Sequence, residues 1–340
     1  MKRVAVFVLV MVLALAGAGV WFYLGIDAPY KGYESTEQFV EIPQGAGPAA
    51  IGRRLVAAGV VRNRTTFRIA LWATGQGRRL QAGEYRFDTP VSARQVIEKI
   101  ARGEIFVQPI TFREGLTIKQ MAALYEARGF GTADAFIKAA HNTALVSALD
   151  PAARDLEGYL FPDTYMLSRK ATADQLVSRM VEEFSKALTP ELRQQALARG
   201  LDVRQLVTLA SMVEKETGRP EERPLIAAVY TNRLRLGMGL QCDPTVIYAL
   251  ERAGRYNGNL TRADLQFDSP YNTYRYAGLP PGPIASPGRA SLAAAAAPQE
   301  VTFLYFVSRN DGSHAFATTL DEHNRNVQEF QVKYFRERRQ

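Results

Sequence analysis

The chain lacks the residues that most metal-dependent and nucleophilic enzymes need. It has one cysteine, Cys242, and three histidines in 340 residues. No two histidines lie four positions apart, and no HExxH, P-loop, G-x-G-x-x-G or G-x-S-x-G motif occurs. We therefore expect no metal, no cofactor and no serine or cysteine nucleophile, which leaves chemistry carried by carboxylates.

The single cysteine also excludes an intramolecular disulfide framework. A domain outside the cytoplasm would then need a hydrophobic core large enough to fold unaided. The net charge of +8 suits an anionic partner. An exported chain rarely meets nucleic acid, so we expect anionic lipid or an anionic cell-wall polymer and no nucleic acid.

The N-terminus carries a long run without charge. Lys2 and Arg3 precede 23 uncharged residues, from Val4 to Ile26. Such a run can span a bilayer with some tilt and exceeds the apolar core of about 7–15 residues in a cleaved signal peptide, although the small residues at 14–19 leave cleavage open. Positive charge before a span keeps the N-terminus in the cytoplasm. The prediction is a single transmembrane anchor over residues 1–26, with the rest of the chain outside the cytoplasm.

A strand–turn–helix pattern occurs twice after a polar linker at 27–38. The first copy begins with a strand at 39–42 and the second with a strand at 110–112. Gly45 and Gly115 lie 70 positions apart, as do Gly59 and Gly129. Two copies are too few for a solenoid. We predict a region of small strand–helix modules over 39–150, which either binds an extended polymer or is a plain packing unit.

The remaining residues, 151–335, combine amphipathic helices with loops rich in polar and aromatic groups. The patterns predict helices at 174–187, 190–199, 203–216, 221–236 and 291–297, and a hairpin with strands around 303–307 and Phe316. The loop at 278–284 is rigid and rich in glycine and proline, so we expect it to shield a site from water. The predicted fold class is α+β, with a larger mixed domain after the small modules.

One carboxylate lies on the apolar stripe of a predicted helix. Glu214 shares a helical face with Ala210 and Val207, while Glu216 turns to another face. A carboxyl group on such a face loses hydration, which disfavours its charged form and raises its pKa. That environment suits a general acid. The alternative is a helix end whose carboxylate merely borders the core.

The groups around this helix suit a sugar polymer, because sugar faces stack on tyrosine and sugar hydroxyls take fixed polar partners. Several segments carry a more specific pattern, in this order: 210–217 (ASMVEKET), 232–234 (NRL), 240–248 (LQCDPTVIY), 271–274 (YNTY), 278–284 (GLPPGPI) and 314–324. Together they resemble the endolytic murein transglycosylase family, the YceG-like proteins, from about residue 40 to 330. One departure is Cys242, where this resemblance leads us to expect a small hydroxyl residue such as threonine.

The resemblance implies a membrane-anchored enzyme that cuts nascent peptidoglycan strands internally, between N-acetylmuramic acid and N-acetylglucosamine. It implies 1,6-anhydro ends, a LysM-like wall-binding region at 39–150 and a transglycosylase domain at 151–335. The catalytic carboxylate would be Glu214, with Glu216 pointing elsewhere. The expected partners are glycan strands, the inner membrane through residues 4–26, and glycan polymerases or penicillin-binding proteins.

In the expected mechanism Glu214 protonates the glycosidic oxygen and then accepts the proton of the C6 hydroxyl, which closes on C1 of the same sugar. Each candidate for sugar binding could instead stabilise a turn; the candidates are Gln241, Asp243, Thr245, Tyr271, Asn272 and Tyr274. Two alternatives stay open. One is a muramidase in which Asp243 is a second carboxylate that works on water. The other is a wall-binding anchor without catalysis.

Overall fold

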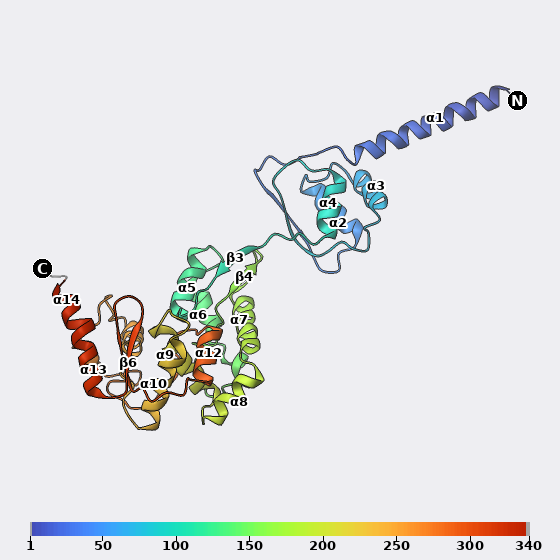
Figure 1. Ribbon diagram of the computed structural model, residues 1–340. Helices are drawn as coiled ribbons and strands as arrows, with labels where there is room; N and C mark the ends of the chain where they lie inside the picture. The colour runs from blue at the N-terminus through green and yellow to red at the C-terminus, as the bar shows by residue number, and fades with distance from the viewer. Residues whose placement is uncertain (1, 338–340) are drawn as a thin grey trace. The chain divides into compact units, whose positions relative to one another are not determined.

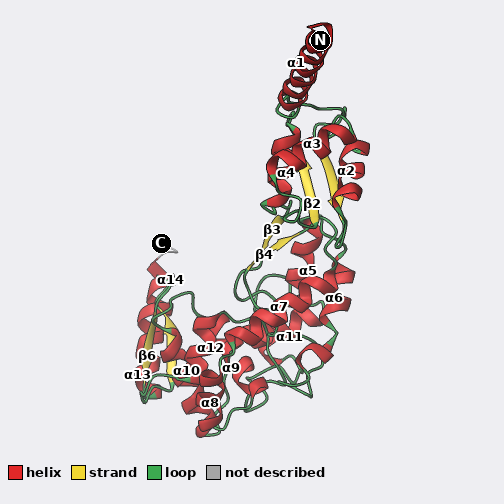
Figure 2. Cartoon of the chain, turned by 90° about the vertical axis from the view of Figure 1, so that its right-hand side faces the viewer, coloured by secondary structure: helices red, strands yellow, loops and turns green. Residues whose placement is uncertain are grey.

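The computed structural model describes residues 2–337, apart from the side chains at 2–6, 15, 18, 21–24, 335 and 337. The chain combines helices with small two-stranded sheets, so the predicted α+β class is confirmed (Figure 2). It divides into two compact units, Met1–Gln108 and Pro109–Gln340. Each unit has its own hydrophobic core.

The first unit contains an antiparallel pair of strands and the helices that pack with it. Its elements after the N-terminal helix are β1 (Gln38–Ile42), α2 (Pro48–Ala57), α3 (Arg64–Thr74), β2 (Gly83–Phe87) and α4 (Ala93–Ala101). Helix α4 begins at a capping box, because the Ser92 side chain accepts from the Gln95 N–H and the Gln95 side chain accepts from the Ser92 N–H. The apolar face of α4 is fully buried in the core of this unit.

Helix α1 (Lys2–Gly25) precedes this sheet and contacts α3. Its described apolar side chains from Phe7 to Leu13 are exposed. Within the described part of the chain, no helix combines the length and the apolar character that a membrane crossing requires. The span predicted over residues 4–26 therefore receives no support from the structure.

The second unit begins with a copy of the arrangement found in the first. Strand β3 (Gln108–Thr111) and helix α5 (Ile118–Ala127) begin 70 positions after β1 and α2, and α6 (Ala133–Ala140) corresponds to α3. Gly45 and Gly115 occupy the same left-handed conformation, with φ of 75° and 76°, which glycine adopts at little cost. The 70-residue repeat predicted from glycine spacing is therefore present in the fold.

Strand pairing places the boundary between the units earlier than the sequence predicted. Strand β3 pairs with β4 (Thr164–Leu167), and α6 packs on α7 (Ala173–Ala187). Residues 109–150 therefore belong with the residues that follow them, and the predicted boundary at 150/151 falls inside the second unit. The aromatic segment that contains β4 has turn residues around it, and for this reason its sequence did not indicate a strand.

The rest of the second unit is built around α9 (Val203–Glu216), which is buried on all sides from Leu206 to Val213. Helix α9 packs against α8 (Pro190–Ala198), α10 (Arg223–Arg235), α11 (Asp243–Arg252) and the alanine-rich α12 (Arg289–Ala296) (Figure 1). The hairpin of β5 (Tyr305–Ser308) and β6 (His314–Ala317) follows, then α13 (Leu320–Val327), a π-helical turn (Gln328–Lys333) and α14 (Tyr334–Glu337). The C-terminal turn of α9 thus lies close to the hairpin and to the loops before α11 and α12.

Candidate active site

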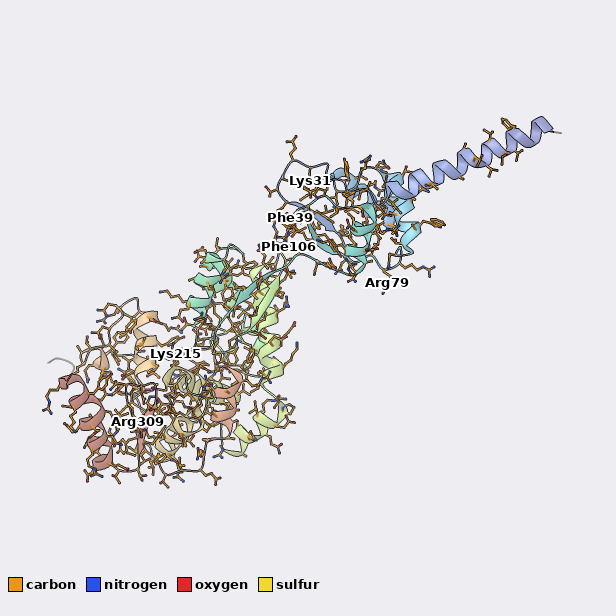
Figure 3. The ribbon with its side chains drawn as sticks, turned by 45° about the horizontal axis from the view of Figure 1, so that its top comes forward. Lys31, Phe39, Arg79, Phe106, Lys215 and Arg309 are labelled. Carbon is orange, nitrogen blue, oxygen red and sulfur yellow. The ribbon has the colours of Figure 1, made fainter. Side chains whose placement is uncertain are left out.

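Two carboxylates leave the last turn of α9 in different directions. The helix begins at an Asp202–Gln205 capping box and ends at Glu216, where Thr217 becomes extended. Glu214 and Glu216 are two residues apart, so about 200° of helical turn separates their side chains. Lys215 lies between them in the sequence and is labelled in Figure 3. Its Nζ donates to the Gly115 carbonyl at 3.2 Å. The two carboxylates therefore meet different surroundings.

Glu214 is engaged in a buried ion pair. Its Oε1 accepts from Arg223 Nη2 at 2.9 Å, and its Oε2 accepts from the Gly288 N–H at 2.9 Å. The Glu214 and Arg223 side chains are only 5% and 9% exposed. The same guanidinium contacts Glu114 at 3.4 Å, and burial together with the charge of Glu214 raises the pKa of Glu114. These bonds hold the end of α9 to the starts of α10 and α12.

Glu216 borders a cavity of about 290 Å³ on the other side of the helix. Its Oε1 accepts from the Tyr230 hydroxyl at 2.5 Å. Burial raises the pKa of Glu216, and hydrogen bonds with Tyr230 and Cys242 oppose that rise without cancelling it. A carboxyl group in such a site keeps its proton to higher pH than an exposed one. Glu216, rather than Glu214, therefore has the environment of a general acid.

Gln241, Asp243 and Tyr274 line the same cavity, so the fold brings three of the predicted sugar-binding residues to Glu216. The Tyr274 hydroxyl donates to Asp243 Oδ1 at 2.6 Å. Gln241 has a φ of 52°, which is uncommon for a residue with a side chain, and its N–H donates to the Thr273 carbonyl at 3.2 Å. Strained backbone of this kind concentrates at functional sites.

The other predicted sugar-binding residues lie elsewhere. Thr245 is fully buried, and its hydroxyl donates to the Cys242 carbonyl at 2.7 Å. Asn272 is also fully buried and donates to the carbonyls of Leu265 and Phe267. Both side chains are closed off from the cavity by their burial, and their hydrogen bonds hold the loops in place.

Tyr271 and the proline-rich loop border a different, smaller cavity. Tyr271 lies there with Glu157, Arg252 and residues 281–283. The loop at 278–284 was expected to shield a site from water, and the residues lining the cavity beside Glu216 do not include it. Gly158 instead lies so close to Pro283 and Val207 that an added Cβ would clash with both.

His314 and Arg233 also line the cavity and were not selected from the sequence, although both lie in the motifs quoted for the family resemblance. His314 contacts Glu222 through Nδ1 at 2.7 Å, and its N–H donates to Glu222 Oε1 at 2.9 Å. Burial alone would raise the pKa of Glu222, but the bonds with His314 have the larger combined effect. The pKa of Glu222 is therefore lowered, and the group is held as a carboxylate. Arg233 donates to the Leu304 carbonyl at 2.7 Å and to Leu240 at 2.9 Å, which fixes the cavity wall.

Cys242, the departure from the expected hydroxyl residue, is fully buried beside Glu216. Its thiol is hydrogen-bonded with Glu216 and with Tyr230. Burial raises the pKa of this thiol, so it remains protonated and is not a nucleophile. The substitution therefore changes a group that contacts the carboxyl of Glu216.

Comparison with known proteins gives the chain a family. The YceG-like family model matches residues 40–329. An endolytic murein transglycosylase of Bacillus subtilis (strain 168) is 31% identical over 313 residues, which cover 87% of this chain and 86% of that protein. An endolytic murein transglycosylase of Streptococcus pneumoniae (strain D39) is also 31% identical, over 93% of this chain but 63% of that protein.

A solved structure agrees with the sequence comparisons. The crystal structure of a yceG-like protein from Listeria monocytogenes superposes with a TM-score of 0.58 and 30% identity, over 85% of this chain and 98% of that one. The chain therefore belongs to the YceG-like family, and its relatives place it among the transglycosylase enzymes, so the family and the enzyme class predicted from its motifs are both confirmed.

Proposed function

We propose that this enzyme cuts peptidoglycan strands internally, between N-acetylmuramic acid and N-acetylglucosamine, and that Glu216 is its acid and base. The observation that carries the proposal is the cavity in which a carboxyl of raised pKa meets Gln241, Asp243 and Tyr274. The relatives named above are endolytic murein transglycosylases, which supports peptidoglycan as the substrate.

The chemistry requires one carboxyl group that changes its role. Protonated Glu216 gives its proton to the glycosidic oxygen as the bond from that oxygen to C1 breaks. The resulting carboxylate then takes the proton of the C6 hydroxyl on the same muramic acid, and O6 bonds to C1. The products are a new 4-hydroxyl end and a 1,6-anhydro end, and Glu216 is protonated again. Closure within one sugar is favourable because effective molarities of such reactions reach about 10⁵–10⁸ M.

The neighbours of Glu216 supply what the reaction needs besides the proton. Asp243 carries negative charge that stabilises the positive charge developing at C1. The Tyr274 hydroxyl fixes the orientation of that carboxylate through the 2.6 Å bond. The side chain of Gln241 provides an amide for a sugar hydroxyl or acetamido group.

A matched pair of variants tests the assignment. Glu216→Gln removes the proton donor and nearly preserves side-chain volume, so cleavage of purified glycan strands should fall by at least about 10²-fold. Glu214→Gln weakens the pair with Arg223 and should lower stability, while the folded fraction keeps most of its activity. Circular dichroism measures the folded fraction of each variant, and the release of fragments from dye-labelled glycan strands measures cleavage. The reverse pattern, an inactive Glu214→Gln beside an active Glu216→Gln, would return the acid to Glu214.

A muramidase is the second candidate, because Asp243 shares the cavity with Glu216. In that reaction Asp243 would activate water, and the new ends would be reducing sugars. Asp243→Asn would then abolish cleavage as completely as Glu216→Gln. In the transglycosylase reaction, Asp243→Asn lowers the rate but leaves anhydro ends as the product.

We also propose that residues 4–26 anchor the protein in the inner membrane, with the second unit in the periplasm, beside glycan polymerases. The support is the 23-residue run without charge that follows Lys2 and Arg3 in the sequence. Membrane fractions should retain the full chain after a carbonate wash. Recovery of the full chain in the soluble fraction would contradict the anchor. Crosslinking in cells tests whether the protein contacts glycan polymerases.

A further inference from the structure

Nearly all of the net positive charge lies in one stretch of the first unit. Between Glu41 and Glu84 the sequence contains seven arginines and no acidic residue or lysine, which gives the stretch a charge of +7 against +8 for the whole chain. This stretch forms α2, α3 and the loops beside them. Arg79, the last of the seven, lies at the surface of the unit (Figure 3).

A groove of about 760 Å³ lies between α2, α3 and the loop after α3. Its apolar lining includes Gly52, Phe67 and Leu71. Its basic residues are Arg53, Arg64, Arg68 and Arg78. Trp72, at the same groove, is 85% exposed. The groove thus joins an apolar floor to a basic border and one exposed aromatic ring.

Fold stability does not account for these residues. Arg64 and Arg68 lie one turn apart on α3, where like charges weaken a helix. An exposed tryptophan gains nothing from the hydrophobic effect until another surface covers it. A binding surface for an anionic amphiphile explains both features. The planar guanidinium of arginine forms bidentate hydrogen bonds with phosphate, and tryptophan prefers the boundary between water and lipid.

We propose that this groove binds the headgroup of an anionic phospholipid, with the phosphate against Arg64, Arg68 and Arg78 and the first part of an acyl chain on Leu71 and Trp72. The contact between α3 and α1 favours a membrane lipid over a wall polymer, because α1 carries exposed apolar side chains. The inference rests on the proposed membrane location and is independent of the chemistry at Glu216. Binding there would set the first unit against the membrane surface.

Tryptophan fluorescence can read the groove directly. The chain has two tryptophans, so Trp21→Phe leaves Trp72 as the only reporter. The full-length protein is mixed with phosphatidylcholine vesicles, with or without 30% phosphatidylglycerol, that carry brominated acyl chains. We expect Trp72 quenching to rise at least twofold with phosphatidylglycerol. Replacing Arg64, Arg68 and Arg78 with glutamine should weaken binding to the anionic vesicles about tenfold or more.

A control removes equal charge elsewhere. Arg193, Arg199 and Arg235 are exposed residues of the second unit, and their replacement with glutamine should leave the quenching unchanged. The proposal would be overturned if Trp72 quenching were equal with neutral and anionic vesicles, or if there were no quenching. It would also be overturned if both triple variants lost the same amount of quenching. If α1 inserts into the vesicles while the groove binds no lipid, the quenching of Trp72 does not depend on the phosphatidylglycerol content. The strand-cleavage activity of each variant is measured separately and reports on the proposed function.

Discussion

Glu157 should make the stability of the second unit fall as pH rises. Its side chain is buried, its Oε1 accepts from the Ile118 N–H at 3.0 Å, and its Oε2 accepts from the Tyr248 hydroxyl at 3.2 Å. Burial raises the pKa of Glu157 to about 8, and the charge of Asp155 adds to the rise. The carboxyl is therefore neutral at pH 7 in the folded protein.

The sign follows from proton binding. The folded pKa lies above the unfolded value of 4.5, so between about pH 4.5 and 8 the folded chain holds a proton that the unfolded chain has lost. Stability contributed by this group is fully present below pH 4.5 and is lost as pH rises to about 8. A pKa difference of about 3.5 corresponds to about 5 kcal/mol.

Glu157→Gln isolates this effect, because glutamine has the same shape but no titrating proton. We expect the variant to be within about 1 kcal/mol of the parent at pH 5 and several kcal/mol more stable at pH 8.5. Urea unfolding followed by far-UV circular dichroism at pH 5, 6.5 and 8.5 measures the difference. Both tryptophans lie in the first unit, so the fluorescence transition is an internal control that the substitution leaves unchanged. Parent and variant curves that stay parallel across this pH range would refute the reasoning.

Three further substitutions test the account of the cavity and of the core. Tyr230→Phe removes a hydrogen bond that lowers the pKa of Glu216, so the alkaline limb of the pH–rate profile should move to higher pH. Cys242→Ser replaces the thiol with a better donor and should move that limb to lower pH; no movement in either variant would contradict Glu216 as the acid. Arg204→Gln leaves the buried Asp150 without its ion pair and should cost about 3 kcal/mol in urea unfolding, and Asp150→Asn in that background should recover part of the loss.

Local rules predicted most of the helices and the internal repeat. The Asp202 cap and the apolar spacing of α9 located that helix within a residue of its ends. The equal offsets of Gly45 and Gly115 revealed the repeat, because a left-handed turn before a helix depends on glycine. Strand pairing was not predictable in this way. Strand β4 is four residues long and pairs with a strand more than 50 positions earlier, so tertiary contacts rather than local pattern define it.

The two glutamates at the end of α9 illustrate a second limit of sequence patterns. The apolar stripe selected Glu214, but α9 is buried on every side, so sharing a face with core residues does not show which carboxylate meets the cavity. Gln241, Asp243 and Tyr274 were selected by residue type and motif, and the fold brings them to Glu216. Thr245 and Asn272 are also polar residues of the quoted motifs, but both are fully buried, which the sequence alone does not reveal.

The most direct test of the central claim is mass spectrometry of the ends formed when the full-length protein digests purified glycan strands, with Glu216→Gln as the control. The account predicts 1,6-anhydro ends, lighter by one water than reducing ends, and their disappearance with Glu216→Gln. Reducing ends would contradict the transglycosylase reaction, and anhydro ends made at the normal rate by Glu216→Gln would contradict the role of Glu216.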